Sequence, residues 1–317
     1  MNFSVITTQF WSLVLQGLAL GLIYSLVALG YTMVYGVLRL INFANSEVFM
    51  FGTFATLWVE VNLLGNPVAT QPLHGFKLVG HLVLALVGSM IACALLAVLV
   101  ELVAYRRLRA RGASRLSSLI SAIGVSIFLL EGMRIFTESR PRTAPRLLEK
   151  WSFGEVAGAN FRIDTVLVIV APILIFILLD RFVNLSRFGK AIRAVSLSEE
   201  NSKLMGININ KVVTLTFMIG GLTTGAAAFL YTTVYENTVF NVGFTMGMAA
   251  FTAAIMGGIG NIRGAFYGGL ALGMLEQFAS AVLGSQWKAV TVFVVLVTIL
   301  LFRPNGLFGE AVQQTRT

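Results

Sequence analysis

Long hydrophobic runs, separated by short polar stretches, extend along almost the whole chain. A helix needs about 20 mainly apolar residues to cross the hydrocarbon core of a membrane. The pattern predicts an all-α polytopic membrane protein with eight or nine spanning or partly spanning helices, organised as a single transmembrane domain over residues 1–317. The predicted segments are 11–36, 44–62, 79–104, 116–134, 164–180, 212–235, 244–261, 264–283 and 287–302.

Three of these segments differ from the others. Segments 44–62, 244–261 and 264–283 are short, glycine-rich or interrupted by polar residues. Irregular backbone is tolerated at membrane depth only where protein or a water-filled cavity satisfies its polar groups. We therefore expect some of these segments to be half-helices that border a cavity, as in many transporters.

The composition agrees with insertion in a membrane. Apolar residues make up 57% of the chain, charged residues only 12%, and the mean hydropathy is +0.84. The net charge of +9 does not indicate nucleic-acid binding, because the basic residues lie between hydrophobic runs and form no stripe with aromatic residues. Membrane topology explains the basic excess better, since Lys and Arg concentrate in cytoplasmic loops.

Two basic regions set the expected orientation. One is the 181–211 loop. The other comes earlier in the chain and contains Arg106, Arg107, Arg109, Arg111 and Arg115. With both regions in the cytoplasm, alternating spans place the N-terminus and the 62–78 loop outside and the C-terminal tail inside. The 135–163 loop is then external in spite of its basic residues. Either it forms a folded cap, or segment 116–134 does not fully cross.

Small residues predict close helix packing in both halves of the chain. Gly17 and Gly21, like Gly269 and Gly273, are four residues apart, so each pair lies on one helix face. Small faces let helices approach closely in lipid, and we interpret these glycines as packing sites rather than ligand contacts. In both halves a glycine-rich helix precedes an interrupted polar segment, which indicates an internal duplication.

The most informative polar stretch is the 42–47 segment, NFANSE, between two hydrophobic runs. In one interpretation it is a loop at the cytoplasmic surface, where Asn45 or Ser46 caps the next helix and Glu47 lies in the first turn. In the other, the helix begins deeper, and Asn42, Asn45 and Glu47 border a substrate pathway. An acid at depth is costly unless it faces a wet cavity or a partner, so both interpretations stay open.

Two further acids lie within predicted helices. Glu276 falls inside segment 264–283, where it either lines the pathway or forms a hydrogen bond between helices. Glu131 and Arg134 are three residues apart near the end of segment 116–134, and a local ion pair is expected there.

The 181–211 loop carries a predicted short helix over residues 198–205. Ser198 is expected to cap this helix, and Gly206 to end it. The apolar positions that give it a modest hydrophobic face are Val195, Leu197, Leu204 and Met205. Such a helix either docks into a groove of a partner protein or lies on anionic lipid.

Motifs of several other functions are absent from the sequence. It contains no nucleotide-binding G-x-x-x-x-G-K-[ST] loop, no dinucleotide fingerprint and no nucleophile elbow. The single cysteine, Cys93, lies in an apolar stretch, and the two histidines match no zinc motif. We expect no catalytic residue, no metal site and no cofactor in this chain.

Several stretches resemble branched-chain amino acid ABC transporter permeases of the LivH and LivM type, and the LivH-like subunit most closely. The first is GLIYSLVALGYTMVYGVLRLINFANSEVFMFG, similar to the family pattern ALxxxGxxxxYGxxxxxNFAxGE, although Ser46 stands where the family has glycine. The others are GKAIRAVSLSEENSKLMGININKVVTLTFMIGG, AFTAAIMGGIGNIRGAFYGGLALGMLEQ and LLFRPNGLFG. Together they cover more than half of the chain in the order and spacing of the family.

The resemblance implies a permease subunit that translocates branched-chain amino acids across the bacterial inner membrane. It also implies a second homologous permease, two cytoplasmic ATP-binding subunits and a periplasmic amino-acid-binding protein. The loop helix resembles the coupling motif of such permeases, in which Glu-Ala-Ala is followed three residues later by glycine. Both alanines are replaced here, but the spacing to Gly206 is kept. The resemblance therefore favours docking on an ATPase over the lipid-surface interpretation. The expected coupling residues are Glu199, Glu200, Asn201, Ser202 and Gly206.

Other functions are kept as alternatives. Related permeases carry urea, amides or other amino acids. An ion-coupled secondary transporter needs an acid at the membrane midplane, for which Glu276 is the best candidate. A membrane scaffold without transport activity is the third alternative.

Overall fold

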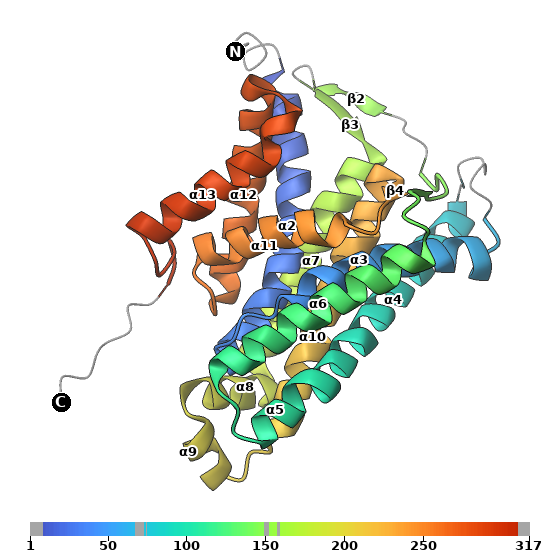
Figure 1. Ribbon diagram of the computed structural model, residues 1–317. Helices are drawn as coiled ribbons and strands as arrows, with labels where there is room; N and C mark the ends of the chain where they lie inside the picture. Colours follow the sequence, from blue (N-terminus) through green and yellow to red (C-terminus); the bar gives the residue numbers. More distant parts are fainter. Residues whose placement is uncertain (1–8, 67–72, 74, 149–151, 157–158, 310–317) are drawn as a thin grey trace.

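The computed structural model describes residues 9–66, 73, 75–148, 152–156 and 159–309. The fold is a bundle of helices with a few short strands (Figure 1). Seven helices in the described part are long and apolar enough to cross a membrane, which supports the predicted polytopic fold. They are α2 (Phe10–Leu38), α4 (Gly75–Val100) with its extension to Ala110, α6 (Arg115–Phe136), α7 (Ile163–Leu185), α10 (Ile209–Tyr235), α12 (Ile262–Leu283) and α13 (Lys288–Phe302).

Two of the three atypical segments are short helices. Segment 44–62 forms α3 (Ala44–Trp58) and a π-helical turn (Val59–Leu63), and segment 244–261 forms α11 (Val242–Gly257). Segment 264–283 is different, because it folds into the continuous helix α12 and is not a half-helix. Its glycines do not break the helix. A Cβ at Gly268 would meet the backbone of Ala253 and Gly257 on α11, so the absence of side chains lets two helices touch.

Helices α2 and α10 form the centre of the bundle. Most of their side chains are buried, while α6 and α13 leave large apolar side chains exposed. Helix α2 packs against α12 and α10, and α4 packs on the other side of α10. The peripheral helices therefore present the apolar surface that lipid requires.

The predicted glycine packing holds between α2 and α12. A Cβ at Gly21 would lie 2.9 Å from the carbonyl oxygen of Gly269, and Gly273 sits directly against Gly21 and Gly17. Ser25 adds a hydrogen bond of 2.7 Å to the carbonyl of Phe266 across the same interface. The two backbones are therefore in contact, as the small residues predicted.

The first basic region is helical and does not lie in a loop as expected. Helix α4 continues through a π-helical turn (Glu101–Tyr105) into α5 (Arg106–Ala110). Arg106, Arg107 and Arg109 therefore extend the helix beyond its apolar part. Contacts with α10 keep this region helical.

The 135–163 loop is folded. Its strand β1 (Arg142–Thr143) pairs with β4 (Asn237–Thr238), and β2 (Ser152–Val156) pairs with β3 (Ala159–Arg162). Helix α6 has 22 residues, enough to cross. Of the two options for this region, the structure agrees with a folded cap at the end of a full-length helix.

The 181–211 loop contains two helices, of which only the second was predicted. Helix α8 (Arg187–Leu197) precedes α9 (Glu199–Leu204), and both lie at the end of the bundle opposite to β2 and β3 (Figure 1). Ser186 starts α8, with its hydroxyl accepting a hydrogen bond of 2.9 Å from the backbone N–H of Gly189.

Candidate functional site

The 42–47 segment is buried, and its first residue fixes the start of α3. The side-chain oxygen of Asn42 accepts hydrogen bonds from the backbone N–H of Ala44 (3.2 Å) and the hydroxyl of Tyr105 (3.1 Å). Asn45 and Ser46 lie within the first turn. The prediction that one of them caps this helix is wrong, because Asn42 supplies the accepting oxygen two residues earlier.

The segment lies deep in the bundle. Asn45 accepts a hydrogen bond of 3.3 Å from Thr224, which lies about 22 Å along α10 from its first residue at 1.5 Å per residue. The amide nitrogen of Asn45 faces Gly30, about 12 Å from the end of α2. A loop at the membrane surface could not make these contacts, so the structure favours the interpretation in which α3 begins at depth.

The carboxylate of Glu47 lies where two short helices meet. Its side chain is only 1% exposed, and Oε1 accepts hydrogen bonds from Ser46 (3.2 Å) and from Ser126 of α6 (3.3 Å). Oε2 faces the first turn of α11, where a Cβ at Gly243 would lie 3.0 Å away. The N-terminal ends of α3 and α11 thus both stabilise negative charge at this point.

Two buried polar atoms of this segment lack hydrogen-bond partners among the described residues. They are Glu47 Oε2 and Asn45 Nδ2. Buried polar groups are usually satisfied, so a group of unsatisfied ones marks a place for water or a ligand. A cavity beside Tyr31 and Phe251 holds only about 10 Å³, which is about one water molecule. This cavity is too small to hold an amino acid.

Glu276 does not join the 42–47 segment. It is buried on α12 and accepts a hydrogen bond of 2.8 Å from the hydroxyl of Tyr24 on α2. This is the helix-to-helix hydrogen bond that was one of its two predicted roles. The structure therefore groups Asn42, Asn45 and Glu47 and places Glu276 elsewhere, where α12 contacts α2.

Helix α9 has the predicted ends. Ser198 accepts a hydrogen bond of 3.2 Å from the backbone N–H of Asn201, and Gly206 follows the helix with a φ of +79°. Leu204 and Met205 are 83% and 82% exposed, so the C-terminal end of α9 presents an exposed apolar surface. Val195 was expected on this surface but is buried on α8, because α8 packs that side against the bundle.

The two loop helices are tied to the membrane helices. Arg193 donates a hydrogen bond of 2.6 Å to the carbonyl of Val183 on α7, and Gly189 lies directly against the same residue. Arg39, at the end of α2, donates a hydrogen bond of 3.1 Å to the carbonyl of Ser196. Helix α8 is therefore bonded directly to both α7 and the end of α2.

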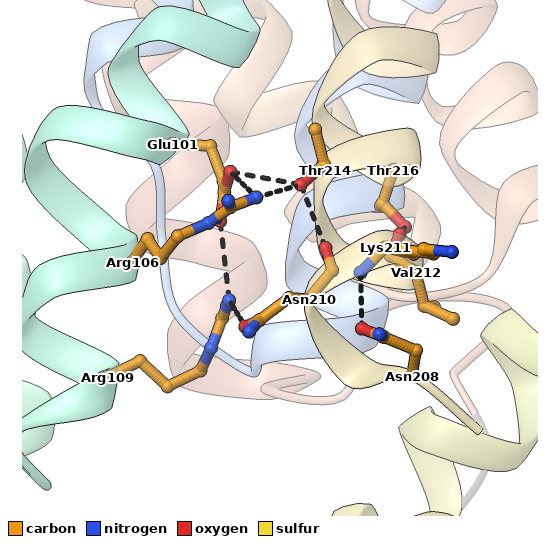
Figure 2. A network of polar contacts seen from close by, with 9 residues as sticks. All are labelled: Glu101, Arg106, Arg109, Asn208, Asn210, Lys211, Val212, Thr214 and Thr216. Atoms are coloured by element: carbon orange, nitrogen blue, oxygen red, sulfur yellow. Dashed lines mark hydrogen bonds and ion pairs between the residues drawn. The ribbon is translucent and has the colours of Figure 1, made fainter. Parts of the chain in front are cut away.

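At the same end of the bundle as α8 and α9 (Figure 1), another buried acid holds the α4–α5 helix to α10 (Figure 2). Glu101 is fully buried and forms ion pairs with Arg106 at 3.1 Å and Arg109 at 3.3 Å. Thr214 donates to the same carboxylate at 3.1 Å, and Arg109 donates to Asn210 at 2.7 Å. These bonds explain why the basic region is helical, since α5 must continue α4 for both arginines to reach Glu101.

Sequence reasoning missed most partners of the buried acids and asparagines. Tyr24, Tyr105, Ser126 and Thr224 are single hydroxyls in apolar helices, and nothing in their spacing identifies the helix that they face. Glu101 did carry a signal, because arginines follow it within about two helical turns.

The chain matches a family model described as the permease component of the branched-chain amino acid transport system, over residues 13–302. The chain belongs to this permease family. The high-affinity branched-chain amino acid permease BraD of Pseudomonas aeruginosa is 40% identical over 93% of this chain and 94% of its own length. For LivH of Escherichia coli the identity is 37% over the same shares. The ribose import permease RbsC of Haemophilus influenzae is 25% identical over 56% of this chain.

Family membership settles the general role. The chain is a multi-pass membrane subunit of an ABC importer and a transport protein rather than an enzyme. Importers of this family work with ATP-hydrolysing and substrate-binding partners. The match does not favour the secondary transporter or the scaffold.

Proposed function

We propose that this chain carries branched-chain amino acids across the bacterial inner membrane. In the proposed assembly it pairs with a second homologous permease, two cytoplasmic ATP-binding subunits and a periplasmic amino-acid-binding protein. One observation supports this above all others: relatives with this named role match the chain across nearly the whole helical bundle. The basic end with α5, α8 and α9 is then cytoplasmic, and the end with β2 and β3 is periplasmic.

The 42–47 segment is the proposed point of contact with the substrate. A free amino acid is a zwitterion, so it needs an acceptor for its ammonium group and donors for its carboxylate. Glu47 Oε2 is a buried acceptor, and Asn45 Nδ2 a buried donor, that lack partners among the described residues. Asn42 holds the first turn in place through Tyr105. Glu276, bonded to Tyr24, is proposed to border the pathway at a separate level.

Opening of the pathway is proposed to come from the loop helices. The surface of α9 that meets an ATP-binding subunit contains Glu199, Glu200 and Asn201, while buried Ser202 and the turn at Gly206 hold the helix in place. Because α8 is bonded to α7 and α2, a push on α9 would tilt the helices that surround the 42–47 segment.

Uptake of labelled leucine tests the proposal in a strain that lacks this chain and is complemented with variants. Glu47→Gln is expected to reduce uptake about 10- to 100-fold, because a hydrogen bond to a charged group contributes about 1.5–3 kcal/mol. Glu131→Gln is the matched control, since its carboxylate is half exposed and pairs with Arg134 on the surface of α6. Equal uptake by the two variants would show that Glu47 does not contact the substrate.

Three further measurements test the remaining parts of the proposal. Uptake that persists without the partner ATPase would contradict the importer mechanism, and competition by urea or acetamide, but not by leucine, would assign a different substrate. Glu200→Ala is expected to abolish uptake with unchanged thermal stability, because this side chain is exposed. Full uptake by Glu200→Ala would show that this side chain is not needed for coupling to the ATP-binding subunit.

A further inference from the structure

An open groove of about 550 Å³ lies beside the Glu101 network. It is formed between α5, α8 and the first three turns of α10. Its polar side chains are Arg106, Asn208, Asn210, Lys211 and Thr214, and its apolar ones are Phe188, Leu215 and Met218. The polar and apolar halves are arranged in sequence order along α10, with the polar half at the helix start.

The polar half of the groove is cationic. Among the described residues, the Lys211 ammonium has no ion-pair partner, and Arg106 binds Glu101 through Nε and Nη2 only. Glu101 is fully buried behind the groove, and no acid lines the groove itself. Arg106 and Arg109 share one carboxylate and Lys211 adds a further positive charge, so the site retains positive charge for an anion.

In the proposed orientation, the apolar half of the groove lies on the membrane side of the polar half. Lys211, Leu215 and Met218 are spaced by four and three residues, so they lie on one face of α10. Met218 is about 13 Å along the helix from Ile209 and is 37% exposed, although the helix around it is otherwise buried. A water-soluble partner cannot reach a side chain at that depth, whereas an acyl chain can.

We propose that this groove binds an anionic phospholipid, with its phosphate at Lys211 and Arg106 and one acyl chain along Leu215 and Met218. The helix ends meet the cytoplasmic headgroup layer in the orientation given above, where basic side chains attract anionic lipid. The lipid would fill the space between α5, α8 and α10. It would therefore contact both the Glu101 network and α8, the helix that directly precedes α9.

Lipid retention by the assembled transporter tests this proposal. The purified, delipidated complex is incubated with dioleoyl phosphatidylglycerol or dioleoyl phosphatidylcholine, and bound lipid is counted by native mass spectrometry. We expect preferential binding of phosphatidylglycerol, lowered roughly fivefold by Lys211→Gln, since one basic residue contributes about 1 kcal/mol. Lys190→Gln is the matched control, an exposed lysine on α8 outside the groove, and should bind as the wild type does.

Four outcomes would overturn the proposal. Equal binding by the Lys211 and Lys190 variants would show that the groove charge does not matter, and equal binding of the two lipids would show that the headgroup does not. Displacement of phosphatidylglycerol by an equal concentration of inorganic phosphate would identify a free-anion site. Photo-reactive benzoylphenylalanine in place of Met218 should crosslink to lipid, and crosslinks to a partner subunit instead would assign the groove to a protein interface.

Discussion

Glu101 provides a direct test of how α4 and α10 are held together. Its carboxylate accepts hydrogen bonds from Arg106, Arg109 and Thr214 at 3.1 to 3.3 Å, and its side chain is completely buried. Glu101→Gln keeps the size of the side chain, removes its charge and places an amide group against two guanidinium groups. Both arginines then lose the counter-charge that Figure 2 shows between them.

The expected loss of stability follows from the exposure of the partners. Breaking a fully buried ion pair by removing one charge costs about 3–5 kcal/mol. The side chains of Arg106 and Arg109 are 37% and 19% exposed, so water recovers part of this energy. About 2–3 kcal/mol is expected after this discount. At roughly 2–4 °C per kcal/mol, the apparent melting temperature should fall by about 5–10 °C.

Thermal unfolding of the purified permease in detergent, followed by tryptophan fluorescence, measures this fall as an apparent value at a fixed scan rate. Glu131→Gln is the matched control, because it breaks a glutamate–arginine pair of 2.9 Å whose side chains are 51% and 44% exposed. Exposed pairs contribute at most about 1 kcal/mol. A fall of equal size in both variants would refute the argument that burial decides the contribution of Glu101.

Three further changes test other parts of the fold. Gly273→Val should prevent α2 from packing on α12 and abolish folded protein in a size-exclusion assay, while Gly132→Val, which faces open space on α6, should leave its yield unchanged. Ser198→Ala should cost about 1 kcal/mol in the local stability of α9, seen as faster hydrogen exchange there and not in α10. Tyr24→Phe should lower the melting temperature by leaving the carboxyl of Glu276 unsatisfied, and the further change Glu276→Leu should restore part of it.

The sequence predicted those features that depend on local pattern. Membrane helices follow from hydrophobic length, and the contact of Gly21 with α12 follows from small residues at helical spacing. The cap at Ser198 and the turn at Gly206 depend on residues within one or two turns, so they were also predicted correctly.

Features that depend on distant contacts were not predicted. Helix α8 was missed for another reason: it is polar on average and too short to cross a membrane, although Phe188, Ile192 and Val195 recur at helical spacing. The depth of the 42–47 segment in the bundle is shown by its contacts with Thr224 and Gly30, which lie in other helices. Capping residues are local signals, but Asn45 and Ser46 show that several candidates in a row leave the helix start undetermined.

Glu47 and Glu101 are both buried acids, and their partners distinguish their roles. Donors from two helices surround Glu101 on both oxygens, and such a group has no capacity left for a ligand. Glu47 has donors on one oxygen only, while the other faces α11 with no described partner. Leaving a buried carboxylate oxygen unsatisfied destabilises the fold, and this oxygen is the one at which we propose that the substrate ammonium group binds. A carrier gains from this arrangement, because a site that is complete without its substrate has no reason to bind it.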